Sequence, residues 1–377
     1  MPTDPSSPVA PGEIERLERL VRTNPRVVSF PGPLPGLVPD GVHEIEVEAA
    51  SAEDAHAAAR EWPGAEARGA LVRLRATAAD LERASHPLLR DAAHALLGYV
   101  ASEFSGPLPL RAGRPAIMGI VNVTPDSFSD GGRHLDPKAA EAAARAMIRA
   151  GAAIVDVGGE STRPGSEPVA EDVELHRVVP VVKALAGAGA ALSVDTSKAR
   201  VASEALAAGA TIVNDVAALR SDERLGAAAA RAGATVILMH MRGRPRDMQD
   251  APAYEGDVVA EVARFLRRAI LAAARAGIPE ARTWVDPGFG FGKTRDHNYE
   301  ILQRLHELRS LGRPIVVGTS RKSMLARPGG DAPAERLVAT AASTAAAALA
   351  GAAVARVHDV AEIAEALRVA SLVRGGR

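Results

Sequence analysis

A regular alternation of two kinds of segment, from Arg114 to the end of the chain, restricts the fold more than any other feature. Short β-branched apolar runs of strand length recur, and a helix-like stretch rich in Ala, Leu, Arg and Glu follows each one. Eight such units in about 260 residues match a (β/α)8 TIM barrel in number and length. A doubly wound open sheet, the alternative, more often has five to seven strands and a Gly-rich first turn. The expected strands span Ala116–Val123, Ala153–Val157, Ala191–Asp195, Thr211–Asp215, Thr235–Met239, Thr283–Asp286, Pro314–Gly318 and Val354–His358.

Residues 1–113 do not share this alternation. Residues 1–12 are rich in Pro and Ser and are expected to form a disordered tail. Residues 13–113 mix short helical and strand patterns, which predicts a small mixed α/β N-terminal domain of unknown role before a barrel at 114–377. The expected elements are helices at Glu13–Arg22, Ala52–Arg60 and Leu88–Phe104, strands at His43–Val47 and Ala70–Arg75, and a linker at Ser105–Pro115.

Composition excludes several classes of protein. The absence of cysteine excludes disulfides, thiolate metal sites and a cysteine nucleophile. The balance of 45 Lys+Arg against 46 Asp+Glu, with 3% aromatic residues, argues against a nucleic-acid partner. Met1–Gly12 lacks the pattern of a signal peptide, and the uncharged stretch Leu337–Ala355 is too rich in Ala, Ser, Thr and Gly to enter a membrane. We therefore expect a soluble cytoplasmic protein with no membrane partner.

Polar and charged residues gather where the expected strands end. In a barrel of this type the active site lies at these carboxyl ends. Asp195 and Asp286 each end an apolar run, and Asn214 lies near the end of the fourth strand. For each acid alone, helix capping or an ion pair is an alternative, but two acids in one pocket favour a ligand with amidine-like N–H donors, such as a pterin or guanine edge.

Three of the five lysines, Lys198, Lys293 and Lys322, also lie in these strand-end segments. Arg is the usual cation of this chain, so a lysine can mark a place that requires a compact ammonium group. Lys322 could pair with one of the acids or bind a ring carbonyl or nitrogen of a ligand. His240, within an apolar run on the fifth strand, is at least as readily a structural histidine as a ligand.

Arg356 and His358 are two residues apart on the eighth strand, so their side chains project to the same side. A buried cation is costly unless it is paired, and a phosphate or pyrophosphate would satisfy both residues. Asn122 ends the first strand just before Thr124, Pro125 and Asp126. These oxygen groups suit Mg²⁺, which usually shares its coordination with substrate phosphates, although turn formation is a strong alternative.

Taken together, these segments resemble the dihydropteroate synthase family. The resemblance covers about residues 115–377 and is carried by MGIVNVTPDSFSDGG (118–132) and GAAIVDVGGESTRPG (151–165). The shorter segments VDTSKA, VND, LMHMRG, DPGFGFGK, SRKS and RVHDV follow in the family's order. The resemblance implies condensation of p-aminobenzoate with (7,8-dihydropterin-6-yl)methyl diphosphate, which gives 7,8-dihydropteroate and pyrophosphate in folate biosynthesis.

The resemblance also implies roles for individual residues. Both substrates are small molecules, and the family implies a Mg²⁺ cofactor contacted by Asn122 and a homodimer. Catalysis is expected to involve Arg356, His358 and Lys322, the first two as the pyrophosphate-binding pair. The positions that match the pterin site are Asp195, Asn214, Asp286 and Lys322, and those that match the p-aminobenzoate pocket and its mobile loop are Thr162, Arg163, Pro164, Phe291 and Ser323.

Two other functions are weighed against this one. A methyltetrahydrofolate-type methyltransferase would share the acids and the asparagine but has no reason to hold a pyrophosphate, so Arg356 and His358 argue against it. A non-catalytic pterin-binding paralogue would show gaps in the anion-binding set, and the sequence has none.

Overall fold

The computed structural model confirms the (β/α)8 barrel. It describes residues 8–28, 42–101, 103–104, 106–124, 137–162, 165–243 and 246–374. The parallel strands follow one another around the sheet, and a parallel bridge between Val285 and Ile315 joins its two ends. The strands are β7 (Ala116–Asn122), β8 (Ile154–Gly158), β9 (Ala191–Asp195), β10 (Ile212–Asp215), β11 (Thr235–Met239), β12 (Thr283–Asp286), β13 (Val316–Val317) and β14 (Val354–Val357).

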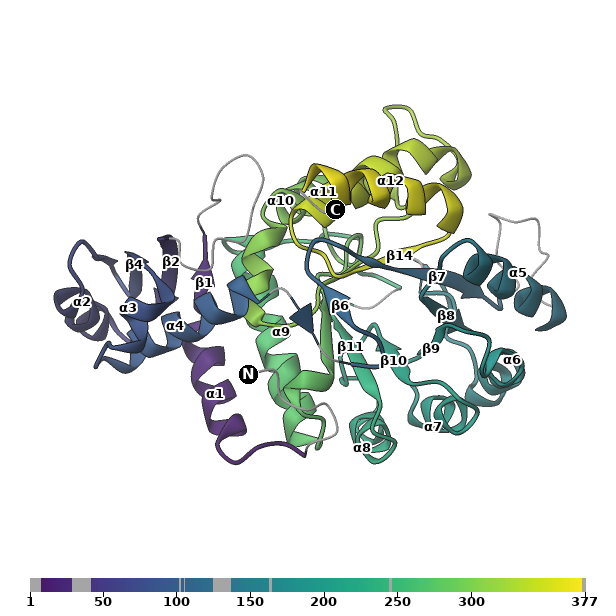
Figure 1. Ribbon diagram of the computed structural model, residues 1–377, viewed down its shortest axis with the longest axis horizontal. Helices are drawn as coiled ribbons and strands as arrows, with labels where there is room; N and C mark the ends of the chain where they lie inside the picture. The colour runs from purple at the N-terminus through teal and green to yellow at the C-terminus, as the bar shows by residue number, and fades with distance from the viewer. Residues whose placement is uncertain are drawn as a thin grey trace.

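Helices surround this sheet on its outer side (Figure 1). The amphipathic pattern explains their placement, because each helix turns its apolar stripe toward the strands. The helix-like stretch after the sixth strand is divided in the structure into an α-helix and a 3-10 helix. The barrel helices are α5 (Pro137–Arg149), α6 (Glu171–Leu185), α7 (Ala199–Ala207), α8 (Arg224–Arg231), α9 (Val258–Arg275), α10 (Arg295–Gln303), α11 (Leu337–Leu349) and α12 (Val360–Val373), with 3-10 helices η1 (Glu280–Arg282), η2 (Leu305–Leu311), η3 (Ser323–Leu325) and η4 (Pro333–Arg336). Within the described ranges, no helix is long and apolar enough to cross a membrane.

A two-stranded hairpin belongs to the end of the barrel where the strands begin. The hairpin pairs β5 (Glu103–Phe104) with β6 (Leu110–Arg111), where the sequence predicts the end of a helix and a linker. Leu110 is buried in one apolar cluster with Trp284 and with residues near the starts of several barrel strands, such as Ile154. This contact explains the difference from the prediction, because burial against the barrel outweighs the turn-forming character of the Pro and Gly residues.

The remaining front residues form a separate antiparallel sheet with its own helices, at the left of Figure 1. The sheet order is β1-β2-β4-β3, and its alternating apolar side chains pack against helices in a core that includes Ile45, Leu74 and Leu89. We propose that these residues are an accessory domain. Its elements are α1 (Glu13–Thr23), β1 (Arg26–Val27), β2 (His43–Glu48), α2 (Ala52–Glu61), β3 (Glu66–Arg68), β4 (Leu71–Ala76), α3 (Ala78–Glu82) and α4 (Pro87–Val100).

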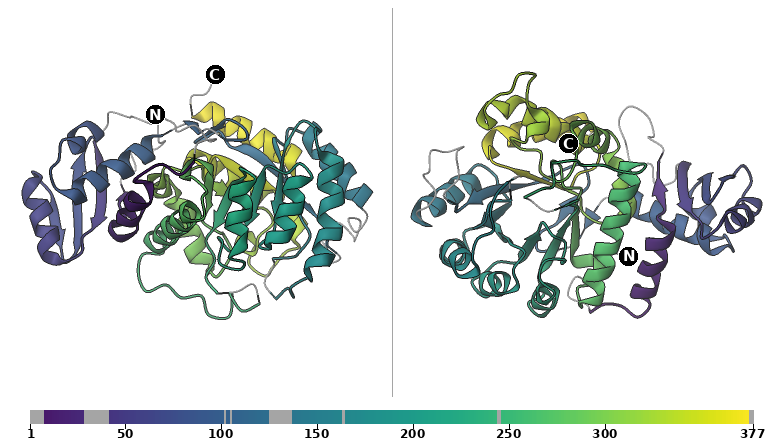
Figure 2. Two further views of the ribbon diagram at one scale, coloured as in Figure 1. Left: turned by 90° about the horizontal axis from the view of Figure 1, so that it is seen from below. Right: turned by 180° about the vertical axis from the view of Figure 1, so that it is seen from behind.

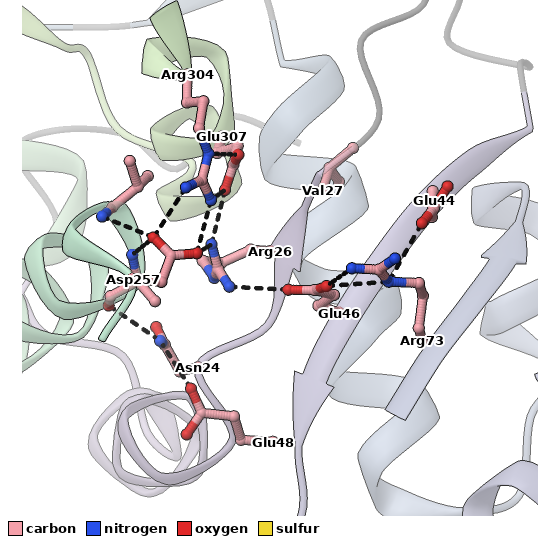
Figure 3. Close-up of polar contacts among 12 residues, drawn as sticks. Asn24, Arg26, Val27, Glu44, Glu46, Glu48, Arg73, Asp257, Arg304 and Glu307 are labelled. Carbon is pink, nitrogen blue, oxygen red and sulfur yellow. Dashed lines mark hydrogen bonds and ion pairs between the residues drawn. The ribbon is translucent and has the colours of Figure 1, made fainter. Parts of the chain in front are cut away.

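The front residues dock on the outside of the barrel, with α1 beside α9 (Figure 2). Arg26, only 4% exposed, ion-pairs with Glu46 of its own sheet at 2.9 Å and with the barrel residues Asp257 at 3.2 Å and Glu307 at 2.7 Å (Figure 3). Asp257 also caps α9 by accepting from the backbone N–H of Val259 at 2.8 Å. This ionic contact therefore joins the accessory sheet to the start of a barrel helix.

Candidate active site

A cavity of about 400 Å³ lies at the carboxyl ends of the barrel strands. Its wall brings together residues from the ends of β7, β9 and β14 and from the segments after β8, β12 and β13. Eight of the predicted site residues line it, namely Asn122, Thr162, Asp195, Phe291, Lys322, Ser323, Arg356 and His358. Asn214 and Asp286 are buried residues that do not line this cavity. Arg163 and Pro164 lie outside the described residues.

The guanidinium group of Arg356 is already paired with two carboxylates of the protein. Its Nε donates to Oδ2 of Asp156 at 2.7 Å, and its Nη2 donates to Oδ2 of Asp195 at 2.7 Å. The same Asp156 oxygen accepts from Nδ2 of Asn214 at 3.0 Å. The charge of Arg356 is therefore balanced inside the protein, so its burial by itself does not require an anion.

Asp156 is the site residue that sequence reasoning missed. It lies in the middle of β8 and is 0% exposed, and its Oδ1 has no hydrogen-bond partner within the described structure. An acid inside an otherwise apolar strand is the signal that points to it, because a fully buried carboxylate needs a partner. Asp156 links the pterin-matched Asn214 to the pyrophosphate-matched Arg356 through one oxygen atom.

Burial and neighbouring charges shift the pKa values of three site residues in opposite directions. Asp195 and Lys322 line the cavity, and Asp286 is buried beside Lys322. Burial raises the pKa of Asp195, and Arg356 counteracts this increase. Burial also raises the pKa of Asp286, while Lys322 counteracts it. For Lys322 burial lowers the pKa to about 8, against the attraction of Asp286. Lys322 is thus an ammonium donor near neutral pH that titrates within reach of ordinary assays.

The ammonium group of Lys322 has two neighbours at the cavity wall. Its Nζ donates to the carbonyl oxygen of Phe289 at 2.5 Å and lies 4.7 Å from the ring centroid of Phe291. A cation over an aromatic face is attracted by the ring's negative centre. These contacts place Lys322 beside the predicted p-aminobenzoate residue Phe291.

Lys293 and His240 support the loop after β12 rather than line the cavity. Lys293 is 3% exposed, and its Nζ bonds Nδ1 of His240 at 2.8 Å and the carbonyl oxygen of Gly288 at 2.8 Å. Burial lowers the pKa of His240 well below its ordinary value, and Lys293 adds to this, so the ring is a neutral acceptor. Of the two roles left open for His240, the described contacts are those of a structural residue.

The turn after Asp286 requires glycine. Oδ1 of Asp286 accepts from the backbone N–H of Gly288 at 2.6 Å, and Gly288 has φ +66°. A Cβ at this position would lie 2.0 Å from the carbonyl oxygen of His240. The backbone of this loop is thereby pressed against the end of β11, which fixes the direction of the Asp286 carboxylate.

A larger cavity of about 1220 Å³ adjoins the first one and shares Asp195 and Thr162 with it. Here Lys198 ion-pairs with Glu160, in the segment after β8, and with the buried Glu174 of α6. Lys198 therefore anchors the segment that carries Thr162, and it does not line the smaller cavity.

The oxygen groups near Asn122 suit a magnesium ion only in part. Asn122 and Thr124 both line the smaller cavity and offer an amide oxygen and a hydroxyl. The part of the chain that the structure describes holds no group of three or more His, Asp or Glu residues arranged for a metal. Two oxygen ligands, from Asn122 and Thr124, fit an ion that takes its other ligands from water and substrate phosphate, as Mg²⁺ does. Pro125 and Asp126 lie outside the described residues.

Comparison with known proteins places these residues in a family. The family model described as "Pterin binding enzyme" matches residues 118–358. Dihydropteroate synthase of Escherichia coli strain K12 is 48% identical over 256 residues, which are 68% of this chain and 90% of that protein.

Two solved structures agree with this result. A Xanthomonas albilineans dihydropteroate synthase with 4-aminobenzoic acid has a TM-score of 0.66 and 46% identity, and the match covers 71% of this chain and 96% of that one. A Burkholderia cenocepacia dihydropteroate synthase complexed with 7,8-dihydropteroate has a TM-score of 0.65 and 42% identity, over 73% of this chain and 97% of that one. With its barrel, its strand-end cavity and these matches, the chain belongs to the dihydropteroate synthase family of pterin-binding enzymes.

Proposed function

We propose that the 400 Å³ cavity is where this dihydropteroate synthase joins p-aminobenzoate to (7,8-dihydropterin-6-yl)methyl diphosphate, giving 7,8-dihydropteroate and pyrophosphate. The observation that carries the proposal is the convergence of an acid, cations and an aromatic ring from four strand ends on one wall, namely Asp195, Phe291, Lys322, Arg356 and His358. A methyl-transferring pterin enzyme would need the acids but not Arg356 and His358 beside them.

The pterin ring is bound by the acidic side of the site. Carboxylates accept from the amidine-like N–H groups of the ring, a role that suits Asp195 and Asp286. Asn214 is bonded to Asp156 and so is oriented to add its amide oxygen to the same edge. Lys322 donates to a ring oxygen or nitrogen, and its position near Asp286 supports this role.

The diphosphate lies on the cationic side. Arg356 uses Nε and Nη2 on its two carboxylates, which leaves Nη1 as the donor for an anion. His358 bonds the Ser320 hydroxyl through Nδ1 at 3.0 Å and lines the cavity beside Arg356, a position that suits contact with the phosphate. Asn122 would hold Mg²⁺ with the substrate phosphates, and the bound ion would neutralise charge on the leaving group.

The p-aminobenzoate enters on the side of Phe291 and Ser323, with Thr162, Arg163 and Pro164 of the neighbouring segment closing over it. Its aniline nitrogen is neutral near pH 7, so the attack requires no strong general base. Arg356 and His358 stabilise the charge that develops on the leaving pyrophosphate as the C–O bond breaks. Excluding water protects the activated pterin from hydrolysis, which competes with the attack of the aniline.

The test is turnover by the purified full chain. With the pterin diphosphate, p-aminobenzoate and Mg²⁺, pyrophosphate and dihydropteroate are expected in equal amounts. Arg356→Ala should weaken binding of inorganic pyrophosphate more than binding of a dihydropterin without phosphates, whereas Arg368→Ala, on an exposed α12 ion pair, should change neither. Pterin binding without turnover at saturating substrates would support the non-catalytic paralogue instead.

Two wider properties belong to this proposal. We infer that the enzyme works as a homodimer, as the family resemblance implies, and that it acts in the cytoplasm on small-molecule substrates. Sedimentation equilibrium of the full chain checks the first property, because a monomeric mass at all accessible protein concentrations would contradict it.

A further inference from the structure

A third cavity lies between the accessory domain and the barrel, far from the catalytic mouth along the barrel axis. Its volume is about 710 Å³. The accessory side contributes α1, α4 and β5, and the barrel side contributes α9, η1 and the segment from the end of η2 to Pro314. Glu280 and Pro314 precede β12 and β13, so the cavity is near the starts of the strands. Residues 118–358 match the family, so the accessory wall comes from residues outside that match.

The charges that line this junction cavity are mostly positive. Arg16, Arg267 and Arg313 line it together with the acids Glu103 and Glu280. Glu103 is 69% exposed at its side chain and pairs with Arg111 at 3.0 Å, so Glu280 is the acid of the lining that faces these guanidinium groups. Outside the lining, Glu13 attracts Arg313 and Asp91 attracts Arg267.

Glu280 does not satisfy these groups fully. Its carboxylate accepts from Nη2 of Arg16 at 3.0 Å, whereas Nη2 of Arg313 lies 3.9 Å away, which is beyond hydrogen-bond distance. Nη1 of Arg313 donates instead to the Glu280 backbone oxygen at 2.6 Å. Arg267 is 4% exposed and donates Nη2 to the carbonyl oxygens of Pro25 and Ser310, at 2.6 and 3.1 Å. Neutral carbonyl oxygens do not cancel its charge.

Two buried guanidinium N–H groups beside this cavity lack an acceptor among the described residues. The Nε atoms of Arg267 and Arg313 have no acceptor within the described structure. Nε2 of His94 lies 2.6 Å from Nη1 of Arg16, and because a guanidinium can only donate, the histidine must accept there and carry its proton on Nδ1. Behind the wall, the buried Asp91 attracts Arg267 but pairs with Arg19 at 3.6 Å and accepts from Thr23 at 3.1 Å.

His94 of α4 is affected by the same charges that line the cavity. The pKa of this exposed histidine is lowered to about 4, first by loss of solvation beside its neighbours and next by Arg16, with Arg267 and Arg313 adding to the effect and Glu280 opposing it. Three cations and one acid of the lining thus act on this histidine in addition to the loss of solvation, and both effects favour its neutral form.

The rest of the wall is apolar. Leu17 and Leu20 of α1, Leu97 of α4 and Ile270 of α9 line the cavity, with Phe104 of the hairpin at its edge. We propose that the junction cavity binds a small organic anion, whose acidic group contacts Arg16, Arg313 and the Nδ1–H of His94 and whose apolar body lies against these side chains. Such a ligand supplies acceptors for the guanidinium and imidazole N–H groups of the wall and removes apolar surface from water in the same step. It also contacts both parts of the chain at once.

The experiment uses the full chain labelled with ¹⁵N-histidine, because the His94 side-chain signals report on this cavity and not on the catalytic mouth. Hexyl phosphate and hexanoate are the two probes, with the same apolar body and different acidic groups. Inorganic phosphate is the probe without an apolar body. Saturable shifts of the His94 signals and an increase in its pKa are expected with both organic probes, and weaker binding with inorganic phosphate. If one organic probe binds and the other does not, the acidic group is thereby assigned to the phosphate or the carboxylate class.

Three variants make the test specific. Leu97→Glu adds a carboxylate at a 43% exposed position on the wall, and Arg313→Gln removes a cation. Each is expected to weaken probe binding about tenfold or more, because Leu97→Glu repels the acidic group of the probe and Arg313→Gln removes one charge-assisted contact. Arg275→Gln is the matched control, since Arg275 pairs with Glu18 at 2.7 Å between α9 and α1 without lining the cavity, and it should bind as the parent does.

The proposal is overturned if the His94 signals do not respond to either organic probe, or if Leu97→Glu binds as the parent does. Leu97→Glu keeps the test decisive even if Arg313→Gln fails to fold, because Leu97 is exposed. The His94 signals and the affinity of the probes do not depend on turnover. A failure of this proposal can therefore be distinguished from a failure of the proposed catalytic function.

Discussion

At the scale of single residues, Asp156 connects two parts of the site that the sequence motifs treat separately. One carboxylate oxygen accepts from Arg356 and from Asn214, at 2.7 and 3.0 Å, inside the apolar strand β8. An oxygen shared in this way fixes the relative position of the two donors. The distance between the pterin-binding and anion-binding groups therefore depends on a residue that lines neither described cavity of the mouth.

Asp156→Asn keeps the shape of the side chain and removes its charge. We expect kcat/KM to fall about 100-fold, the size of loss that follows from small displacements of positioning groups. The free energy of unfolding is expected to fall by about 3 kcal/mol, as when one partner of a buried ion pair is removed. Steady-state kinetics and urea unfolding measure both. The exposed control Glu365→Gln should change neither, and an Asp156→Asn enzyme with parental kcat/KM would exclude the positioning role.

Lys322 makes pterin binding depend on pH. Its pKa is lowered to about 8, so the proton that makes it a cationic donor is present below pH 8 and is lost as the pH rises through this value. Affinity for a dihydropterin is therefore expected to be nearly flat below about pH 7 and to decrease as the pH rises through about 8. Calorimetry across this range measures the effect. Lys322→Met should bind more weakly at pH 7 and lack the alkaline decrease, whereas a decrease of equal size in the variant would assign the titration to another group.

At the scale of elements, the barrel strands hold the acids while the loops that follow them are tied down by buried polar contacts. The β12–α10 loop is the best example, because Lys293 joins it to the end of β11 through His240 and the Gly288 carbonyl oxygen. The ammonium also donates to the Phe291 carbonyl oxygen at 3.1 Å. The loop that presents Phe291 is thus held in position by the side chain of one buried lysine.

Lys293→Met should release this loop. The substitution leaves carbonyl oxygens and the His240 nitrogen without their donor, which is expected to cost about 2 kcal/mol of the free energy of unfolding. KM for p-aminobenzoate should rise more than kcat falls, since Lys293 does not line the 400 Å³ cavity. Thermal unfolding and kinetics test the two effects. Lys183→Met on α6, a lysine outside the strand ends, is the control, and equal changes in both variants would contradict the loop-positioning role.

At the scale of the whole molecule, the accessory residues and the barrel share a buried ionic contact. Arg26 lies among Glu46, Asp257 and Glu307, and Arg304 also pairs with Asp257 at 2.7 Å (Figure 3). Arg267 of α9 adds a buried hydrogen bond to the backbone of Pro25. These contacts make the accessory residues part of the outer surface of the barrel rather than a freely tethered appendage.

Arg26→Met removes the cation that faces three carboxylates. We expect the free energy of unfolding to decrease by about 3 kcal/mol, because the acids remain buried with less compensation. Arg68→Met, at an exposed ion pair on β3, should change it by less than about 0.5 kcal/mol. Urea unfolding monitored at the two tryptophans, Trp62 in the accessory part and Trp284 in the barrel, shows whether both parts lose stability. Loss at Trp62 alone would indicate that the two parts unfold independently.

The barrel and much of its mouth can be predicted from the sequence because they depend on local patterns. Periodicity marks β9, β11 and β12 with the observed bounds, since a strand buried on both faces needs a continuous apolar run. Strand direction then brings the ends together, so the convergence of Asp195, Lys322 and Arg356 follows from topology. Composition alone likewise excludes disulfides and thiolate metal sites and argues against a nucleic-acid partner.

Contacts between distant segments required the tertiary structure. Asp156 pairs with Arg356 across 200 positions of sequence, and Arg26 pairs with Glu307 across 281. No local pattern reports which charges meet, because the energy of an ion pair depends on distance and burial rather than on sequence separation. The hairpin at Phe104 and Leu110, which resembles a linker in sequence, takes its structure from the apolar barrel end that it covers. The sequence by itself determined the barrel and the chemical types at its mouth, and folding in three dimensions decided which charges are balanced and which remain available at the junction cavity.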